Sequence, residues 1–204
     1  MRIIRAGEHI QHIPGYGISV RESGVAVGGA LLYDTFTDED NTLLADHTMD
    51  VGPGWTIIQS PFTIFGNRAR CCDSPWGLVA ADAGQASATA RVVTTIPSRS
   101  GEVLGLVVWA ASQSAFYGIG PIPNSGLFAI RIGVFGTILA STPWVGGTEN
   151  RIIECVCDAS TGTLTATLDG GSEITASGLT PTTYFGMRGR YTIDYFDDFE
   201  VSAL

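Results

Sequence analysis

Apolar and polar residues alternate with a period of two along most of this chain. Residues 151–158, RIIECVCD, place Ile153 and two cysteines on one side of an extended strand. After the turn-like ASTG, residues 163–168, TLTATL, alternate apolar side chains with threonines. Because successive side chains of a strand point to opposite faces, the two segments are predicted to form a hairpin whose buried face consists of Ile153, Cys155, Cys157, Leu164, Ala166 and Leu168.

Further strand-like segments recur along the chain, separated by Gly, Pro, Asn and Ser. No stretch keeps apolar residues at i, i+3, i+4 and i+7 for three turns, and the best helix candidate, 41–48, would form one or two turns. Many short strands at regular spacing indicate an all-β protein, an antiparallel two-sheet β-sandwich of the jelly-roll type. The predicted strands lie within residues 55–59, 86–96, 102–112, 115–120, 127–141 and 172–176.

Residues 1–32 differ from the rest because they are rich in glycine and contain short apolar runs. We interpret them as an extended N-terminal arm, followed by one domain over 33–204. A glycine-rich terminal segment is ordered only when something holds it. The arm is therefore predicted to dock on its own domain or to add as a strand to a neighbouring chain, through Ile18, Val20, Val25, Val27 and Leu31.

Composition narrows the function classes. The 204 residues carry a net charge of −9, which argues against nucleic acid as a general partner, since phosphate binding requires a basic surface. No stretch approaches the about 20 apolar residues of a membrane span. Residues 8–12, EHIQH, are polar where a secretion signal has its apolar core.

Four cysteines occur as Cys71-Cys72 and as Cys155 and Cys157. Buried free thiols are the favoured interpretation in the absence of a secretion signal. A disulfide between the two groups stays open, whereas a zinc site is disfavoured by the spacing.

Three stretches resemble one known family. They are YDTFTDEDNTLLADHTMDVGPGW (33–55), NRIIECVCDASTGTLTATLDGG (150–171) and YFDDFEV (195–201). They resemble the concanavalin A-like, laminin-G-like jelly-roll domains, a lectin and glucanase fold, found in bacteriophage structural proteins. The resemblance covers residues 33–204 and implies that the first and last strands lie side by side. Core or near-core aromatic residues would then be Phe36, Trp55, Phe196 and Phe199.

The acidic residues of these two terminal segments raise the possibility of a metal. Calcium prefers six to eight oxygen ligands, and a bridging ion would take them from Asp34, Asp38, Asp40, Asn41 and Asp197 or Asp198. The alternative is that these acids are solvated turn residues. The segment is no EF-hand, because Met49 stands where the bidentate glutamate belongs.

Enzymatic activity is not expected. The glucanase branch of the family carries E-x-D-x-x-E, and the nearest match, ENRIIE, has Glu149 and Glu154 but Arg151 in place of the aspartate. Glu8, His9 and His12 could contact a metal but lack a third strong ligand nearby.

Sugar binding remains open. Such a site combines an apolar platform with a few converging polar groups. The candidates are Trp76, Trp144 and Tyr117, of which both tryptophans follow a proline in loop-like sequence. The alternative is that each tryptophan fills the core from a loop.

The resemblance implies a bacteriophage virion protein of the head-decoration or fibre type, which would be located in the virion. It would be anchored, or assembled into a homo-oligomer with itself and other virion proteins, through the arm. The alternative is a carbohydrate-binding module or adhesin that recognises host-surface glycans. No cofactor is expected apart from the calcium considered above.

Overall fold

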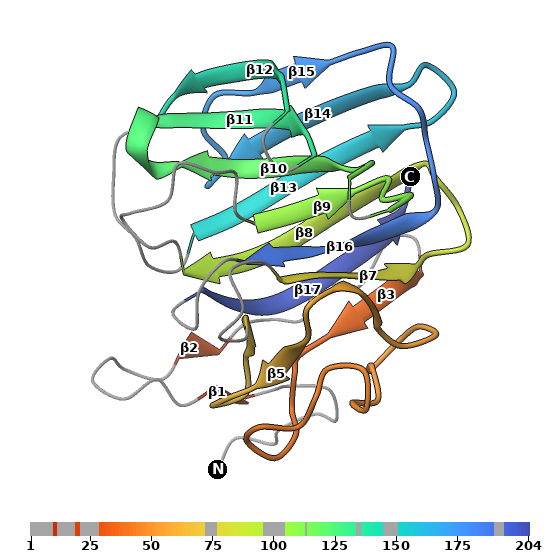
Figure 1. Ribbon diagram of the computed structural model, residues 1–204, viewed down its shortest axis with the longest axis vertical. Coiled ribbons are helices and arrows are strands. Elements are labelled where there is room, and N and C mark those ends of the chain that lie inside the picture. Colours follow the sequence, from red (N-terminus) through yellow and green to blue (C-terminus); the bar gives the residue numbers. More distant parts are fainter. Residues whose placement is uncertain are drawn as a thin grey trace.

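The computed structural model describes residues 10–11, 19–20, 29–71, 77–95, 105–112, 114–133, 136–144, 151–189 and 194–204. The chain folds into two antiparallel β-sheets packed face to face (Figure 1). The predicted all-β sandwich is confirmed.

Sheet I has seven strands in the order β12-β11-β10-β9-β16-β7-β4. Its apolar side chains alternate between the core and the outer face. The strands are β4 (Thr56–Gln59), β7 (Gly77–Asp82), β9 (Gly105–Val108), β10 (Tyr117–Ile122), β11 (Leu127–Ile132), β12 (Ile138–Pro143) and β16 (Tyr184–Gly189).

Sheet II has the order β15-β14-β13-β8-β17-β6-β5, with β3 paired to β17 as the eighth strand. In Figure 1 it lies behind sheet I. Its strands are β3 (Ala30–Asp34), β5 (Phe62–Ile64), β6 (Ala69–Cys71), β8 (Ala88–Thr95), β13 (Arg151–Asp158), β14 (Thr163–Leu168), β15 (Ile174–Ala176) and β17 (Tyr195–Ala203).

The hairpin of β13 and β14 has the predicted faces. Ile153 is opposite Leu168, and Cys155 is opposite Ala166. These side chains are at most 8% exposed and line the core, while Glu154 points to solvent. Cys155 and Cys157 are buried free thiols, so the disulfide to Cys71 or Cys72 is not formed.

Two local expectations are corrected. Residues 41–48 form turns rather than a helix. Leu43 pairs with Thr63 of β5, so the backbone of this segment bonds to the edge of the sheet instead of forming helical hydrogen bonds. Residues 127–141 form two strands rather than one, since the chain reverses between Ile132 and Ile138. The one short helix among the described residues is a 3-10 turn, Pro123–Ser125, and no helix there is long and apolar enough to cross a membrane.

The first and last strands of the sandwich lie side by side, as the resemblance implied. Phe199 of β17 is opposite Asp34 of β3. The same edge of β17 pairs with β6 at Tyr195 and Phe196. A bulge interrupts β17 between these partners, where Asp198 has a φ of 48°.

The aromatic residues expected in this seam are buried. Trp55 packs edge-on against Phe199 at 4.9 Å between ring centroids, and Phe36 lies 6.0 Å from Trp55. Phe196 contacts Phe62 at 5.7 Å. All are at most 5% exposed, so the predicted core positions are confirmed.

Part of the predicted arm belongs to the sandwich. β3 begins at Ala30, and Leu31 packs against the core of its own chain. Further upstream, β1 (Ile10–Gln11) and β2 (Ser19–Val20) form a two-stranded antiparallel sheet in which Val20 pairs with Ile10. Ile18, Val25 and Val27 lie outside the described residues.

Candidate functional site

Asp34 is the centre of the opening acidic segment, and it is completely buried. Its carboxylate accepts hydrogen bonds from the Trp55 indole at 2.6 Å, the Phe36 backbone N–H at 2.7 Å and the His47 ring Nε2 at 2.9 Å. Burial raises the pKa of Asp34, and these hydrogen bonds offset that effect only in part. A buried carboxylate with three donors is a structural anchor.

His47 links this carboxylate to the surface. Its Nδ1 lies 3.2 Å from Asp38 Oδ2, while its Nε2 faces Asp34. Burial acts to lower the pKa of His47, but hydrogen bonding and charge from Asp34, and then from Asp38, outweigh it and raise the pKa. A carboxylate oxygen faces each ring nitrogen as a hydrogen-bond acceptor, so the imidazolium, which carries an N–H on both nitrogens, is the form that this geometry favours.

The other acids predicted to bind calcium each have hydrogen-bond or ion-pair partners of their own. Asp38 accepts from the Glu39 N–H, and Asp40 accepts from the Gly66 N–H. Asp197 lies 3.8 Å from Arg68 and accepts from the N–H of Asp198. Within the described ranges, no group of three or more His, Cys, Asp and Glu side chains is placed to hold a metal ion. The structure therefore does not bring the predicted ligands together in this part of the chain.

The tryptophans fall into two kinds. Trp55 and Trp109 are at most 5% exposed, and their indole N–H groups donate to Asp34 at 2.6 Å and to the Ala86 carbonyl at 2.7 Å. Trp144 is only half-buried, and its N–H has no acceptor among the described residues. Trp76 lies outside them.

Trp144 sits where the two sheets meet at one end of the sandwich. It follows β12, and its backbone N–H donates to the carbonyl of Gly126, in the turn between β10 and β11, at 2.7 Å. Its indole also packs against the hydrophobic core. Two contacts thus fix the position of the ring, although part of it faces solvent.

Arg151 lies near this indole, and Asp169 is paired with Arg151. The guanidinium carbon of Arg151, the first residue of β13, lies 5.8 Å from the ring centroid. Its Nε contacts Asp169 Oδ2 at 2.6 Å. Asp169 occupies the turn after β14 with a φ of 51°, and its Oδ1 accepts from the Ile152 N–H at 2.7 Å. Trp144, Arg151 and Asp169 are hereafter called the Trp144 cluster.

Tyr117 does not join this cluster. It begins β10, whereas Trp144 is attached to the turn beyond the far end of that strand. The Tyr117 hydroxyl accepts from the Thr180 N–H at 3.0 Å, and its ring packs edge-on against Trp109 at 6.1 Å. These contacts make it part of the wall of the core.

The residues of the nearest glucanase-like motif are also separate from the cluster. Glu154 is on the exposed face of β13, 3.6 Å from Arg91, and Glu149 lies outside the described residues. That the chain is not an enzyme therefore stays a prediction.

Solved structures of low sequence identity share this sandwich. Carbohydrate-binding module CBM66 from Bacillus subtilis matches with a TM-score of 0.55 and 11% identity, over 73% of this chain and 95% of that chain. Domain 4 of AbnA, a GH43 extracellular arabinanase from Geobacillus stearothermophilus solved with arabinotriose, matches with a TM-score of 0.53 and 10% identity, over 86% and 93%. A Bacillus subtilis protein of unknown function with a galectin-like fold gives 0.57 and 8%, over 87% and 98%.

At such low identities, these structural matches establish the fold alone, a lectin-like β-sandwich like that of CBM66. The sequence matches no protein-family model and no curated protein. The three structures come from bacterial sources, and their descriptions mention no virion. The virion role stays a prediction from the sequence resemblance.

Proposed function

We propose that this protein is a carbohydrate-binding module and that the Trp144 cluster is its sugar-binding site. The observation that carries the proposal is the contrast among the tryptophans. Two are buried with their N–H groups bonded, while Trp144 is only partly buried as a residue, and its own N–H is a buried group that lacks an acceptor among the described residues. A buried polar group without a partner costs about 1–3 kcal/mol, so its position beside a partly exposed aromatic ring calls for a functional explanation.

The three side chains have complementary roles. The exposed part of the indole offers an apolar surface for the C–H face of a sugar ring. Arg151 donates to hydroxyl oxygens, and Asp169 accepts from hydroxyl groups. Because Arg151 and Asp169 already neutralise each other, the cluster favours an uncharged sugar.

The structural neighbours support this class of function. CBM66 is a carbohydrate-binding module, and domain 4 of AbnA was solved with arabinotriose. We propose binding without catalysis, since the glucanase motif is incomplete in the sequence.

Glycan-array screening followed by titration calorimetry tests the proposal. The native chain is expected to bind a neutral oligosaccharide saturably, and Trp144→Ala should weaken binding at least about ten-fold. Tyr184→Ala is the matched control because Tyr184 is another exposed aromatic residue, 37% exposed, at the start of β16. Absence of any neutral glycan ligand, or equal losses in the two variants, would contradict the proposal.

Display on a bacteriophage particle is a finer hypothesis that rests on the sequence resemblance. It predicts that the full chain assembles with itself or with other virion proteins through its N-terminal segment. Light scattering of the full chain, compared with a chain that starts at Gly29, measures this. An unchanged monomer in both would contradict self-assembly.

A further inference from the structure

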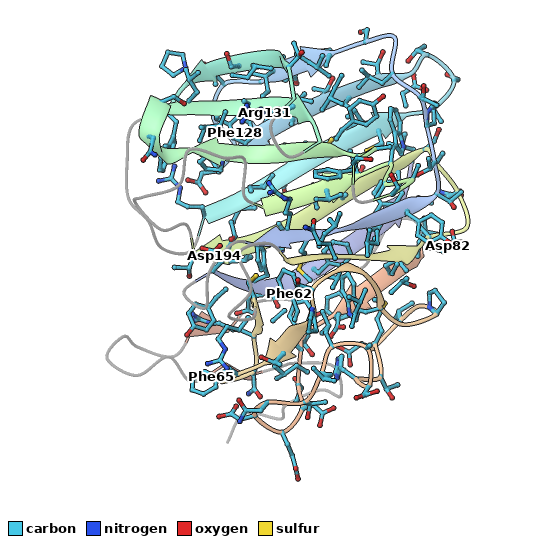
Figure 2. All side chains as sticks on the ribbon, in the orientation of Figure 1. Phe62, Phe65, Asp82, Phe128, Arg131 and Asp194 are labelled. Atoms are coloured by element: carbon cyan, nitrogen blue, oxygen red, sulfur yellow. The ribbon has the colours of Figure 1, made fainter. Side chains whose placement is uncertain are left out.

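The hairpin of β5 and β6 carries an exposed phenylalanine. Phe62 and Ile64 point into the core, whereas Phe65 is 40% exposed. Figure 2 shows Phe65 at the outer margin of the molecule, away from the buried Phe62. The turn that follows is Gly66-Asn67, with φ values of 59° and 56°, and the Phe65 N–H donates to the Arg68 carbonyl at 2.9 Å. This two-residue turn fixes the hairpin register and places Phe65 on the outer face of sheet II.

Arg70 stacks on this ring and has no carboxylate partner among the described residues. Its guanidinium carbon lies 4.5 Å from the Phe65 centroid. One nitrogen donates to the Asn41 side-chain oxygen at 3.4 Å, and the buried Nε has no acceptor among the described residues. Three other arginines, by contrast, lie within 4 Å of an acid: Arg68 with Asp197, Arg91 with Glu154 and Arg151 with Asp169.

The strand register surrounds Arg70 with compatible side chains. Thr63 of β5 and Tyr195 of β17 are directly opposite Arg70, and Leu43 is opposite Thr63. Directly opposed residues of antiparallel strands lie on the same face. Leu43 is 41% exposed and Tyr195 is half-buried. A guanidinium that meets no acid in the described part of the chain thus lies among an exposed aromatic ring, an exposed aliphatic group and hydroxyl-bearing side chains.

We propose that Phe65 and Arg70, with Asn41 and Thr63 beside them, form a second site that binds a carboxylated sugar, a uronic acid residue of an acidic glycan. The sugar carboxylate pairs with the guanidinium, which is held in place by the ring beneath it. The C–H face of the sugar rests on the exposed part of Phe65, and its hydroxyls meet the Asn41 amide and the Thr63 hydroxyl. This inference deepens the proposed function and rests on it.

Charge distinguishes the two sites. The Arg151 guanidinium of the Trp144 cluster is already paired with Asp169, whereas Arg70 is available for an anion. The sites also lie at opposite edges of the sandwich, because β5 and β15 are the two edges of sheet II, and β12, which precedes Trp144, contacts β15. Loss of one site should therefore leave the other intact.

The test is titration of the full chain with a galacturonic acid oligosaccharide, followed by calorimetry and by NMR. Binding is expected to weaken at least about ten-fold in Arg70→Gln, and also when the same oligosaccharide is methyl-esterified, since both changes remove the ion pair. Raising the salt concentration should weaken it as well. Phe65→Ala should weaken it several-fold because the platform is lost.

Arg91→Gln is the matched control, because Arg91 belongs to the same sheet and is already paired with an acid. It should not change the affinity, and neither should Trp144→Ala. Thermal unfolding of each variant verifies that it is folded. Neutral-glycan binding by Arg70→Gln should equal that of the native chain, which separates failure of this site from failure of the proposed function.

Three outcomes would overturn the inference: no binding of the acidic oligosaccharide, equal affinity for the methyl ester, or equal affinity in folded Arg70→Gln. Equal affinity for N-acetylglycine would also overturn it, since a peptide-like carboxylate lacks the sugar ring that Phe65 is proposed to carry.

Discussion

Trp55 and Trp144 show how one residue type serves two purposes in the same sandwich. Trp55 is 5% exposed, contacts Phe199 edge-on and donates to the buried carboxylate of Asp34. Trp144 is half-exposed, with Arg151 near its ring and no acceptor for its N–H among the described residues. A satisfied polar network holds a seam together, whereas an incompletely satisfied one is suited to a ligand.

Truncation should separate the two regions most clearly. Trp55→Ala is expected to destabilise the fold by about 3–5 kcal/mol, because it opens a cavity in the core and removes a donor from buried Asp34. Trp144→Ala should cost only about 1–2 kcal/mol, since its ring is partly exposed. Urea unfolding of both variants measures the difference. Equal losses would mean that Trp144 is as structural as Trp55.

Replacement by phenylalanine isolates the indole N–H in each region. Trp55→Phe is expected to cost about 1–3 kcal/mol, because the Asp34 carboxylate loses its closest donor. Trp144→Phe should cost less than Trp55→Phe or even stabilise the fold, since it removes a buried N–H that has no acceptor among the described residues. It should nonetheless weaken neutral-sugar binding, because a phenyl ring offers a smaller platform than an indole. A cost at Trp144 equal to that at Trp55 would reveal a structural partner for its N–H.

The Trp55 region should also respond to pH, because His47 lies between Asp34 and Asp38. Its folded-state pKa is raised, so its contribution is fully present below the unfolded value of about 6.5. That contribution is lost as the pH rises through the folded pKa. The free energy of unfolding between about pH 6 and 9 should fall in the native chain and in Trp144→Ala, and less in His47→Gln. Parallel curves for all three would contradict this.

A small effect on stability is expected at Asp169. Asp169→Asn removes the ion pair with Arg151 but suits the positive φ of the turn. The free energy of unfolding should change by less than about 1 kcal/mol, while neutral-sugar binding weakens in calorimetry. Unchanged binding would remove Asp169 from the Trp144 cluster.

The residue pattern predicted local structure better than it predicted partners. Alternation identified the buried face of the hairpin formed by β13 and β14, and the resemblance placed Phe199 and Trp55 in the core. The sequence did not show that the Asp34 carboxylate accepts hydrogen bonds from an indole, a histidine ring and a backbone N–H. Nor did it indicate that residues 41–48 are held at a sheet edge instead of coiling into a helix.

The two proposed sites show the same limit. Trp144 stood out in the sequence because it follows a proline in a loop. Its neighbours Arg151 and Asp169 looked like a strand start and a turn residue. Phe65 and Arg70 gave one usable signal, a Phe-Gly-Asn turn that interrupts the alternation and leaves an aromatic residue outside the core.

The sequence by itself determined many of the strands, the inward face of the hairpin of β13 and β14, and several turns, because a period of two and turn-forming residues act over a few neighbouring positions. It did not predict β5, β6, β7 or β16. Only the tertiary structure decided which polar groups find partners. Asp34 meets Trp55 and His47, and Arg151 meets Asp169, whereas Arg70 meets no acid among the described residues. Those outcomes depend on register and on chain crossings between distant segments, and no local pattern encodes them.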